Sequence, residues 1–274
     1  MEPELMLVYL LFGVLGGVLS GLLGVGGGII FIPVFDHIFR SHGIEGEELV
    51  RYILANSFLA ILFAGLSSSL KHWRMGNFHL REVLTIAFPA MVTGVSLSTW
   101  ITHATWYKET YFKLVFMGVI LYTLWRTWVN NRKEATVEEL PYSSTRYSLI
   151  GLATGFISAV SGLGGGVAMI PLLTMWARLD IRKASAISIS VIPIMILPFL
   201  LIYALGNPTS PMPYQWGYLQ FLFTAPVVLG IFIGSPLGVR WGQQMKSSNL
   251  QRIFAGLLIL LVIKYVYELI AGSF

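Results

Sequence analysis

Long apolar stretches separated by short polar breaks dominate the pattern of this chain. A transmembrane helix needs roughly 20 apolar residues to cross a hydrocarbon core of about 30 Å. No stretch alternates polar and apolar residues as the strands of a membrane β-barrel do. The pattern therefore predicts an all-α integral membrane protein of about eight transmembrane helices, near residues 5–24, 49–70, 80–102, 111–129, 147–163, 184–205, 216–239 and 250–270.

Two shorter apolar segments each follow a cluster of glycines. The cluster at residues 24–28 precedes residues 29–35, and the cluster at residues 162–166 precedes residues 167–173. Each apolar tail is too short to cross a bilayer unaided and too hydrophobic for a loop in water. Consecutive glycines break a helix, because each costs about 1 kcal/mol relative to alanine. We expect a broken or re-entrant helix at both places.

The two glycine clusters belong to an internal repeat with an offset of 138 residues. Matching pairs at this offset include Gly13 and Gly151, Gly17 and Gly155, Ser20 and Ser158, Gly24 and Gly162, and residues 26–28 and 164–166. Internal repetition on this scale indicates a duplication. The chain is therefore predicted to contain a first transmembrane repeat (1–129), a polar linker (130–146) and a second repeat (147–274), each with four helices.

Composition supports a membrane location. Only 11% of the residues are charged, against about 25% in soluble domains, so much of the surface must face lipid. The formal net charge of +5 suits an anionic substrate or acidic lipid headgroups, and equally the usual cytoplasmic excess of basic residues. The first apolar run begins acidic and continues to full span length, so we interpret it as a retained helix and not as a cleaved signal. Cysteine is absent, which excludes disulfides and thiolate chemistry.

A helix break at membrane depth exposes backbone groups, which is tolerated only where they face a cavity or other protein. Discontinuous helices of this kind form the substrate sites of many transporters, with half-helix N-termini directed at anions. We therefore predict substrate binding at the two glycine triplets, Gly26, Gly27, Gly28, Gly164, Gly165 and Gly166. A Walker loop and a dinucleotide fingerprint both require further residues that are missing here.

A second group of glycines has the small-xxx-small spacing of tight helix contacts. It comprises Gly13, Gly17 and Gly21 in the first span and Gly230, Gly234 and Gly238 in the seventh. For these residues we favour a packing role. We expect Gly13→Val or Gly234→Val to lower stability, whereas Gly27→Val or Gly165→Val should abolish transport in a folded protein.

Four segments of the chain resemble the sulfite exporter TauE/SafE family. They are residues 20–33 and 161–166, which contain the glycine clusters, together with residues 55–57 and 76–78. The resemblance covers nearly the whole chain and both repeats. It implies a transporter of small sulfur-containing anions such as sulfite or organosulfonates, often an exporter, in the plasma (inner) membrane.

Neutral hydrogen-bond donors can bind an oxyanion without burying a full charge. Early in the second and sixth spans lie Asn56, Ser57, Ser188 and Ser190, which we place in the binding site, with interhelical hydrogen bonding as an equal alternative. Lys71, Arg74, Arg182 and Lys183 flank the same spans, either as an anion funnel or as headgroup anchors.

The apolar spans contain almost no ionisable residue, so neither a nucleophile nor an acid–base pair supports an enzyme, and no cofactor is indicated. His37, His42, His72, His79 and His103 lie in loops or at span ends with no metal-binding spacing, and we interpret them as solvated or interfacial. Coupling to H⁺ or Na⁺, and assembly into a homo-oligomer, are left open. The expected partners are a small anion and the lipid bilayer, not nucleic acid.

Together these features predict a secondary transporter working by alternating access around a site between the two breaks. The alternatives are a small-ion channel, a transporter of another small anion, or a subunit whose partner does the work. An even number of spans in each repeat predicts parallel halves with both termini on one side. We place the termini outside, because Arg178, Arg182, Lys183, Arg240, Lys246 and Arg252 flank loops that should be cytoplasmic, although Lys71, Arg74 and Arg81 favour the reverse.

Overall fold

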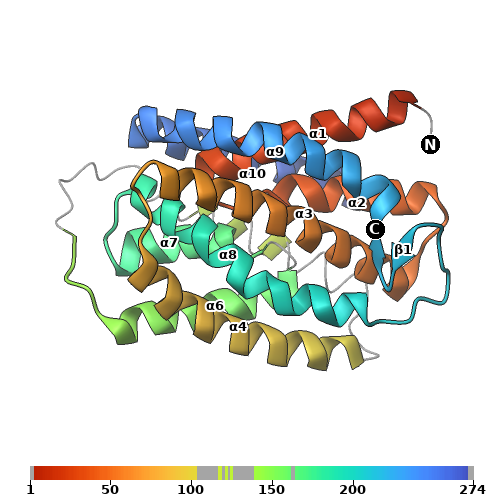
Figure 1. The fold of residues 1–274 in the computed structure, drawn as a ribbon, viewed down its shortest axis with the longest axis horizontal. Coiled ribbons are helices and arrows are strands. Elements are labelled where there is room, and N and C mark those ends of the chain that lie inside the picture. The colour runs from red at the N-terminus through yellow and green to blue at the C-terminus, as the bar shows by residue number, and fades with distance from the viewer. Residues whose placement is uncertain are drawn as a thin grey trace.

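The protein is a bundle of helices with one small β-hairpin (Figure 1). The computed structural model describes residues 3–103, 117–118, 121–122, 124–125, 139–161 and 164–270. The elements are α1 (Pro3–Leu23), α2 (Gly28–Ser41), α3 (Gly46–Arg74), α4 (Leu80–His103), α6 (Ser144–Ser161), α7 (Gly166–Trp176), α8 (Ile181–Ala204), β1 (Gln215–Trp216), β2 (Leu219–Gln220), α9 (Phe221–Gln244) and α10 (Ser247–Ile270).

Five of the described helices, α1, α3, α4, α8 and α9, are long and apolar enough to cross a membrane. Large apolar side chains cover the outer faces of several of them, as lipid contact requires: Leu7, Leu11 and Leu15 on α1, Phe88 and Val92 on α4, and Leu229, Phe232 and Ile233 on α9. Most of the predicted span 111–129 and of the linker 130–146 lies outside the described residues. The eight-helix repeat therefore stays a prediction.

The helices α2 and α7 are too short to span a bilayer. With 14 and 11 residues at a rise of 1.5 Å per residue, they are about 21 and 17 Å long. Each follows a glycine break and carries a proline inside, Pro33 in α2 and Pro171 in α7. They are half-helices, as the glycine clusters predict.

The bundle has two ends that gather different segments. At the hairpin end, Phe223 at the start of α9 contacts Tyr9 near the start of α1 and His42 after α2. Tyr52 of α3 donates a hydrogen bond to Gln215 of β1 at the same end. At the opposite end, which we call the short-loop end, Lys183 pairs with Glu139, and Ser247 donates to Asp180.

The two halves run in opposite directions, so the prediction of parallel halves was wrong. The first break folds the chain back, and α2 returns to the hairpin end where α1 began (Figure 1). The pair α1 and α2 therefore adds no net crossing of the bundle. Because of this reversal α6 starts at the short-loop end, with α7 returning there. Both termini nevertheless lie at one end, since α1 begins and α10 ends at the hairpin end.

Helices of the first half pack against helices of the second half through glycines. A Cβ atom on Gly13 would overlap the carbonyl oxygen of Val227, and one on Gly234 would overlap that of Val14. Helices α1 and α9 are thus in backbone contact along their length, which confirms the packing role of these glycines. On the other side of the bundle, Gly151 and Gly155 of α6 meet the backbone of α4 in the same way.

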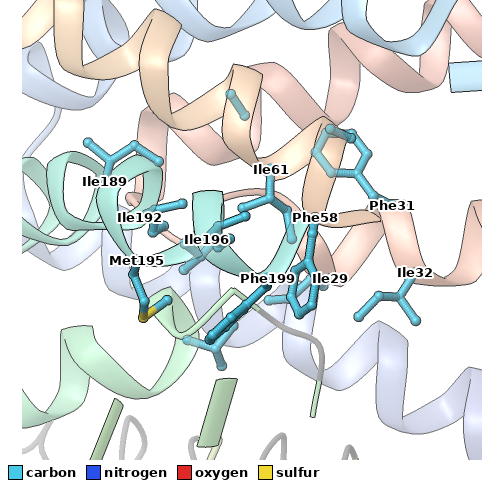
Figure 2. Packing of buried hydrophobic residues seen from close by; sticks show 14 of the residues in the cluster. Ile29, Phe31, Ile32, Phe58, Ile61, Ile189, Ile192, Met195, Ile196 and Phe199 are labelled. Carbon is cyan, nitrogen blue, oxygen red and sulfur yellow. The ribbon is translucent and has the colours of Figure 1, made fainter. Parts of the chain in front are cut away.

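These two pairs form the outer layers, and α3 and α8 cross between them (Figure 1). Helix α2 packs on α3 and α7 packs on α8. The apolar core lies in this middle layer, where Ile61, Ile192, Ile196 and Phe199 are fully buried (Figure 2). Both glycine breaks lie against the helices of this middle layer.

Candidate functional site

The first element of the candidate site is the backbone of the two breaks. Gly24, Gly26 and Gly27 have φ values of 74°, 80° and 79°, and Gly164 and Gly165 have 68° and 74°. These left-handed conformations favour glycine, because a Cβ atom would be strained there. Gly27 and Gly165 are the N-cap residues of α2 and α7 and provide no side-chain cap. Two uncapped helix N-termini, each with a partial positive charge, are therefore buried in the bundle.

The two breaks meet in the middle layer. A Cβ atom on Gly166 would lie 2.7 Å from the backbone of Val25, so one break rests directly on the other. The positions that a Cβ would take on Gly26 and on Gly164 are each 3.0 Å from the same methyl group of Ile61. Gly26 also faces Ile192 and Gly164 faces Ile196, the cluster seen in Figure 2. The structure thus brings the two predicted glycine triplets together around α3 and α8.

Buried hydroxyl groups without partners lie close to the second break. A Cβ on Gly165 would lie 2.6 Å from Cγ2 of Thr154 and 3.5 Å from Cβ of Ser158. Both side chains are fully buried, and neither hydroxyl has a hydrogen-bond partner among the residues that the structure describes. A buried polar group without a partner costs about 1–3 kcal/mol, so such a group calls for an explanation.

The first break is more apolar. The position corresponding to Thr154 is Gly16, and the space next to Gly27 is filled by the ring of Phe31, 2.6 Å from where a Cβ would lie. Ser20, the counterpart of Ser158, is buried with an unpartnered hydroxyl. The duplicated breaks have therefore diverged, and the second has the greater supply of free donors.

Asn56 is fully occupied by protein partners. Its side-chain nitrogen donates to the carbonyl oxygens of Tyr52 and Tyr218 at 2.8 and 2.9 Å. Its side-chain oxygen accepts from the Gln220 backbone nitrogen and the Thr224 hydroxyl, both at 2.8 Å. An amide side chain has two donor hydrogens and two acceptor lone pairs. Asn56 therefore holds the β-hairpin on α3, and nothing remains with which to bind a substrate.

The three predicted serines occupy different environments. Ser188 donates to the carbonyl oxygen of Gly24 at 2.8 Å, and Ser190 donates to Ala186 of its own helix. Ser57 is buried and its hydroxyl has no partner. It lies one turn before Ile61 on α3 and so shares the face that meets the breaks. Ser57 remains a candidate ligand, whereas Ser188 supports the first break.

The predicted funnel residues all lie at the short-loop end. Lys71 and Arg74 end α3, and Arg182 and Lys183 begin α8. Lys183 is paired with Glu139 at 2.6 Å. They share this end with further basic residues of both halves, namely Arg81, Arg146, Arg178, Arg240, Lys246 and Arg252. The inversion of the halves produces this gathering, since it puts the α3–α4 and α9–α10 connections at the same end.

The buried, unpartnered side chains of Thr154, Ser158 and His72 are not among the site residues predicted from the sequence. The available signal was the spacing of hydroxyl residues one and two helical turns before the break. The interpretation of His72 as solvated or interfacial was wrong, because this side chain is 1% exposed. His42 and His79 are partly or fully accessible and agree with that interpretation.

In the described part of the chain, five helices long and apolar enough to cross a membrane, an apolar outer surface and two discontinuous helices that meet in the middle layer are typical of a membrane transporter. The model of the family described as "Sulfite exporter TauE/SafE" matches residues 9–265, and the chain belongs to this family. It is 25% identical over 253 residues to a probable membrane transporter protein of Methanocaldococcus jannaschii, covering 91% of both chains. It is 29% identical over 267 residues to one of Haemophilus influenzae, covering 94% of this chain and 96% of the relative. No solved structure matches the chain.

Proposed function

We propose that the protein carries small sulfur-containing oxyanions, such as sulfite or organosulfonates, across the membrane. The observation that supports this most strongly is the pair of unpartnered hydroxyls of Thr154 and Ser158 beside the uncapped N-terminus of α7. Hydroxyls and backbone N–H groups can bind the oxygens of an anion without a buried countercharge. Ser57 lies one turn before Ile61, which contacts this break from α3.

Alternating access would then use the outer helix pairs and not the two sequence halves as moving bodies. Helix α1 is locked to α9 and α4 to α6 through glycine contacts, whereas the middle layer between them contains the breaks. Movement of the outer pairs relative to α3 and α8 would open the meeting point of the breaks to one end of the bundle at a time.

Binding can be tested by thermal unfolding of the purified protein with sulfite, sulfate, thiosulfate, sulfoacetate and taurine, because a ligand that binds only the folded state raises its stability. Stabilisation by at least one of these anions, absent with chloride at equal ionic strength, is the expected result. Saturable uptake of the same ³⁵S-labelled anion into proteoliposomes would identify a carrier. Large unitary currents would instead identify an ion channel.

Side-chain variants locate the site. Thr154→Val keeps the shape and removes the hydroxyl, and Ser158→Ala does the same with a smaller change. Both variants should raise the anion concentration that half-saturates the thermal shift at least tenfold. Without ligand, each variant should be as stable as the wild type or more stable. Thr174→Val is the matched control, because that hydroxyl is bonded to carbonyls of its own helix α7. Equal behaviour of all three variants would remove the second break from the site.

A further inference from the structure

His72 is an imidazole buried near the short-loop end of α3. It is 1% exposed, and within the described part of the chain neither Nδ1 nor Nε2 has a hydrogen-bond partner. Replacing such a group by an apolar residue of similar shape should be neutral or stabilising. The imidazole of His72 therefore lowers the stability of the fold and makes no hydrogen bond that would offset this cost. A polar group of this kind in a membrane domain points to function.

His72 belongs to a stripe along one face of α3. Ser57, Ile61, Gly65, Ser68 and His72 follow one another at spacings of three or four residues, which places them on the same side of the helix. Ser57 and Ser68 are also buried with unpartnered hydroxyls. Ile61 touches both breaks, and Gly65 packs against Ile192 and Pro193 of α8. The stripe therefore leads from the meeting point of the breaks towards the short-loop end.

The register between α3 and α8 gives the depth of His72. Ser69 donates to the carbonyl oxygen of Ile189 at 3.2 Å, and Gly65 meets Pro193, so the two helices are antiparallel. Continuing this register by one turn puts His72 level with Ser185. The Cα atom of Ser185 lies 2.6 Å from the position of a Cβ on Gly24. His72 is thus level with the first residue of the first break.

Further titratable groups lie beyond His72 at the short-loop end. His79, in the α3–α4 connection, lies within electrostatic reach of His72. His79 in turn lies within electrostatic reach of Glu82, Glu139 and Lys183, and its Nε2 donates a hydrogen bond of 3.1 Å to Oδ1 of Asn77. Other charged groups at this end come from α3, α4, α8 and α9: Lys71, Arg74, Arg81, Arg182 and Arg240.

We propose that His72 takes up and releases a proton that travels with the anion, and that His79 with Glu82 and Glu139 connects it to the short-loop end. In this scheme a free ring nitrogen of neutral His72 accepts one proton and becomes imidazolium, and the same proton leaves when the ring returns to the neutral form. The inference rests on the proposed anion transport.

The electrostatic setting favours movement of proton and anion in the same direction. The basic residues gathered at the short-loop end repel a further positive charge on His72 while no anion is bound. An anion that binds near His72 compensates the charge of the imidazolium, so anion binding promotes proton binding. By reciprocity, proton binding promotes anion binding. Antiport would require the opposite coupling.

Proteoliposomes loaded with the pH dye pyranine test the inference, with ³⁵S-thiosulfate as the probe because its charge is constant between pH 5 and 8. In the wild type, thiosulfate uptake should be accompanied by acidification of the interior and should be driven by an acidic exterior. His72→Gln should abolish acidification and make uptake independent of the pH gradient. Thiosulfate exchange at equal pH should fall less than threefold. His37→Gln, an exposed histidine at the hairpin end, is the matched control and should behave as the wild type.

The unfolding temperature of His72→Leu distinguishes a transport role of His72 from a structural role. If His72 serves transport, this variant should unfold at the same temperature as the wild type or higher, while its uptake is uncoupled from protons. Thiosulfate uptake without acidification in the wild type would overturn the inference alone, as would coupled uptake by His72→Gln. Absence of uptake for thiosulfate and for every other sulfur anion would overturn the proposed function and this inference with it.

Discussion

Ser188 of α8 donates a hydrogen bond of 2.8 Å to the carbonyl oxygen of Gly24, 164 residues earlier in the chain. The two residues belong to different halves, so a helix of the second half holds the break of the first. Gly24 is in a left-handed conformation, and a Cβ there would lie within 2.6 Å of the Cα atom of Ser185, the residue one turn earlier on α8. The first break and the start of α8 therefore form one unit at the short-loop end.

Ser188→Ala should leave the Gly24 carbonyl buried and unpaired. We expect a loss of about 1–3 kcal/mol in the free energy of unfolding, seen as a lower midpoint of thermal unfolding in detergent. Ser190→Ala is the matched control on the same helix, because its hydroxyl is bonded to Ala186, whose carbonyl is within the helical ladder. Ser190→Ala should change stability by less than about 0.5 kcal/mol. Equal losses in the two variants would argue against a supporting role for Ser188.

Asn56→Ala should detach the β-hairpin from α3. The change removes four hydrogen bonds and leaves the Tyr218 carbonyl and the Gln220 nitrogen without partners. Each orphaned group costs about 1–3 kcal/mol, so we expect poor yield and a clearly lower unfolding temperature. The anion concentration that half-saturates the thermal shift should be unchanged in the protein that folds. A variant of normal stability with weakened anion binding would restore Asn56 to the binding site.

The α1–α9 contact allows no added side chain. Gly13→Val and Gly234→Val each drive a side chain into the backbone of the other helix, so both should reduce the folded fraction in size-exclusion chromatography. Gly256→Ala in α10 is the control, because no described atom lies within 4 Å of the new Cβ, and alanine should stabilise the helix by up to about 1 kcal/mol.

Gly27→Val and Gly165→Val are less informative than the sequence alone indicates. Both residues have positive φ, and the new side chains would meet Phe31 and Thr154. A β-branched residue is strongly disfavoured in this conformation, so these variants are expected to unfold and cannot by themselves locate the site. Hydroxyl removal at Thr154 and Ser158 avoids this problem, since it leaves the backbone as it is.

Local features of the fold could be predicted because glycine spacing reports directly on backbone requirements. The triplets mark the left-handed turns at Gly27 and Gly165, and the spacing of Gly13 and Gly17 marks a tight helix contact. The direction of α2 could not be predicted in this way. Hydropathy shows that a short apolar helix follows the break, but not whether it continues the path of α1 or folds back along it.

The candidate site was less predictable, because the roles of its polar residues depend on distant partners. Asn56 in an apolar helix looks like a ligand until its bonds to Tyr218 and Gln220 are seen. His72, between Lys71 and Arg74, looks interfacial from the sequence. The structure buries it on the inner side of α3, while the adjacent Trp73 is 66% exposed.

The inverted halves strengthen the predicted orientation, with both termini outside. With parallel halves, Lys71, Arg74 and Arg81 would lie at the opposite end of the bundle from the basic residues of the second half. The structure puts both groups at the short-loop end. At the hairpin end the described connections and helix ends carry Arg40 and Arg51, each with an acidic neighbour, Asp36 and Glu47. Since an excess of Lys and Arg marks cytoplasmic loops, the short-loop end should be cytoplasmic.

The chain has no cysteine, so single-cysteine variants label cleanly. Ser210→Cys at the hairpin end should react with an impermeant maleimide in intact cells, and Asn249→Cys at the start of α10 should react only after permeabilisation. The reverse pattern of labelling would invert the orientation and place His72 at the outer face.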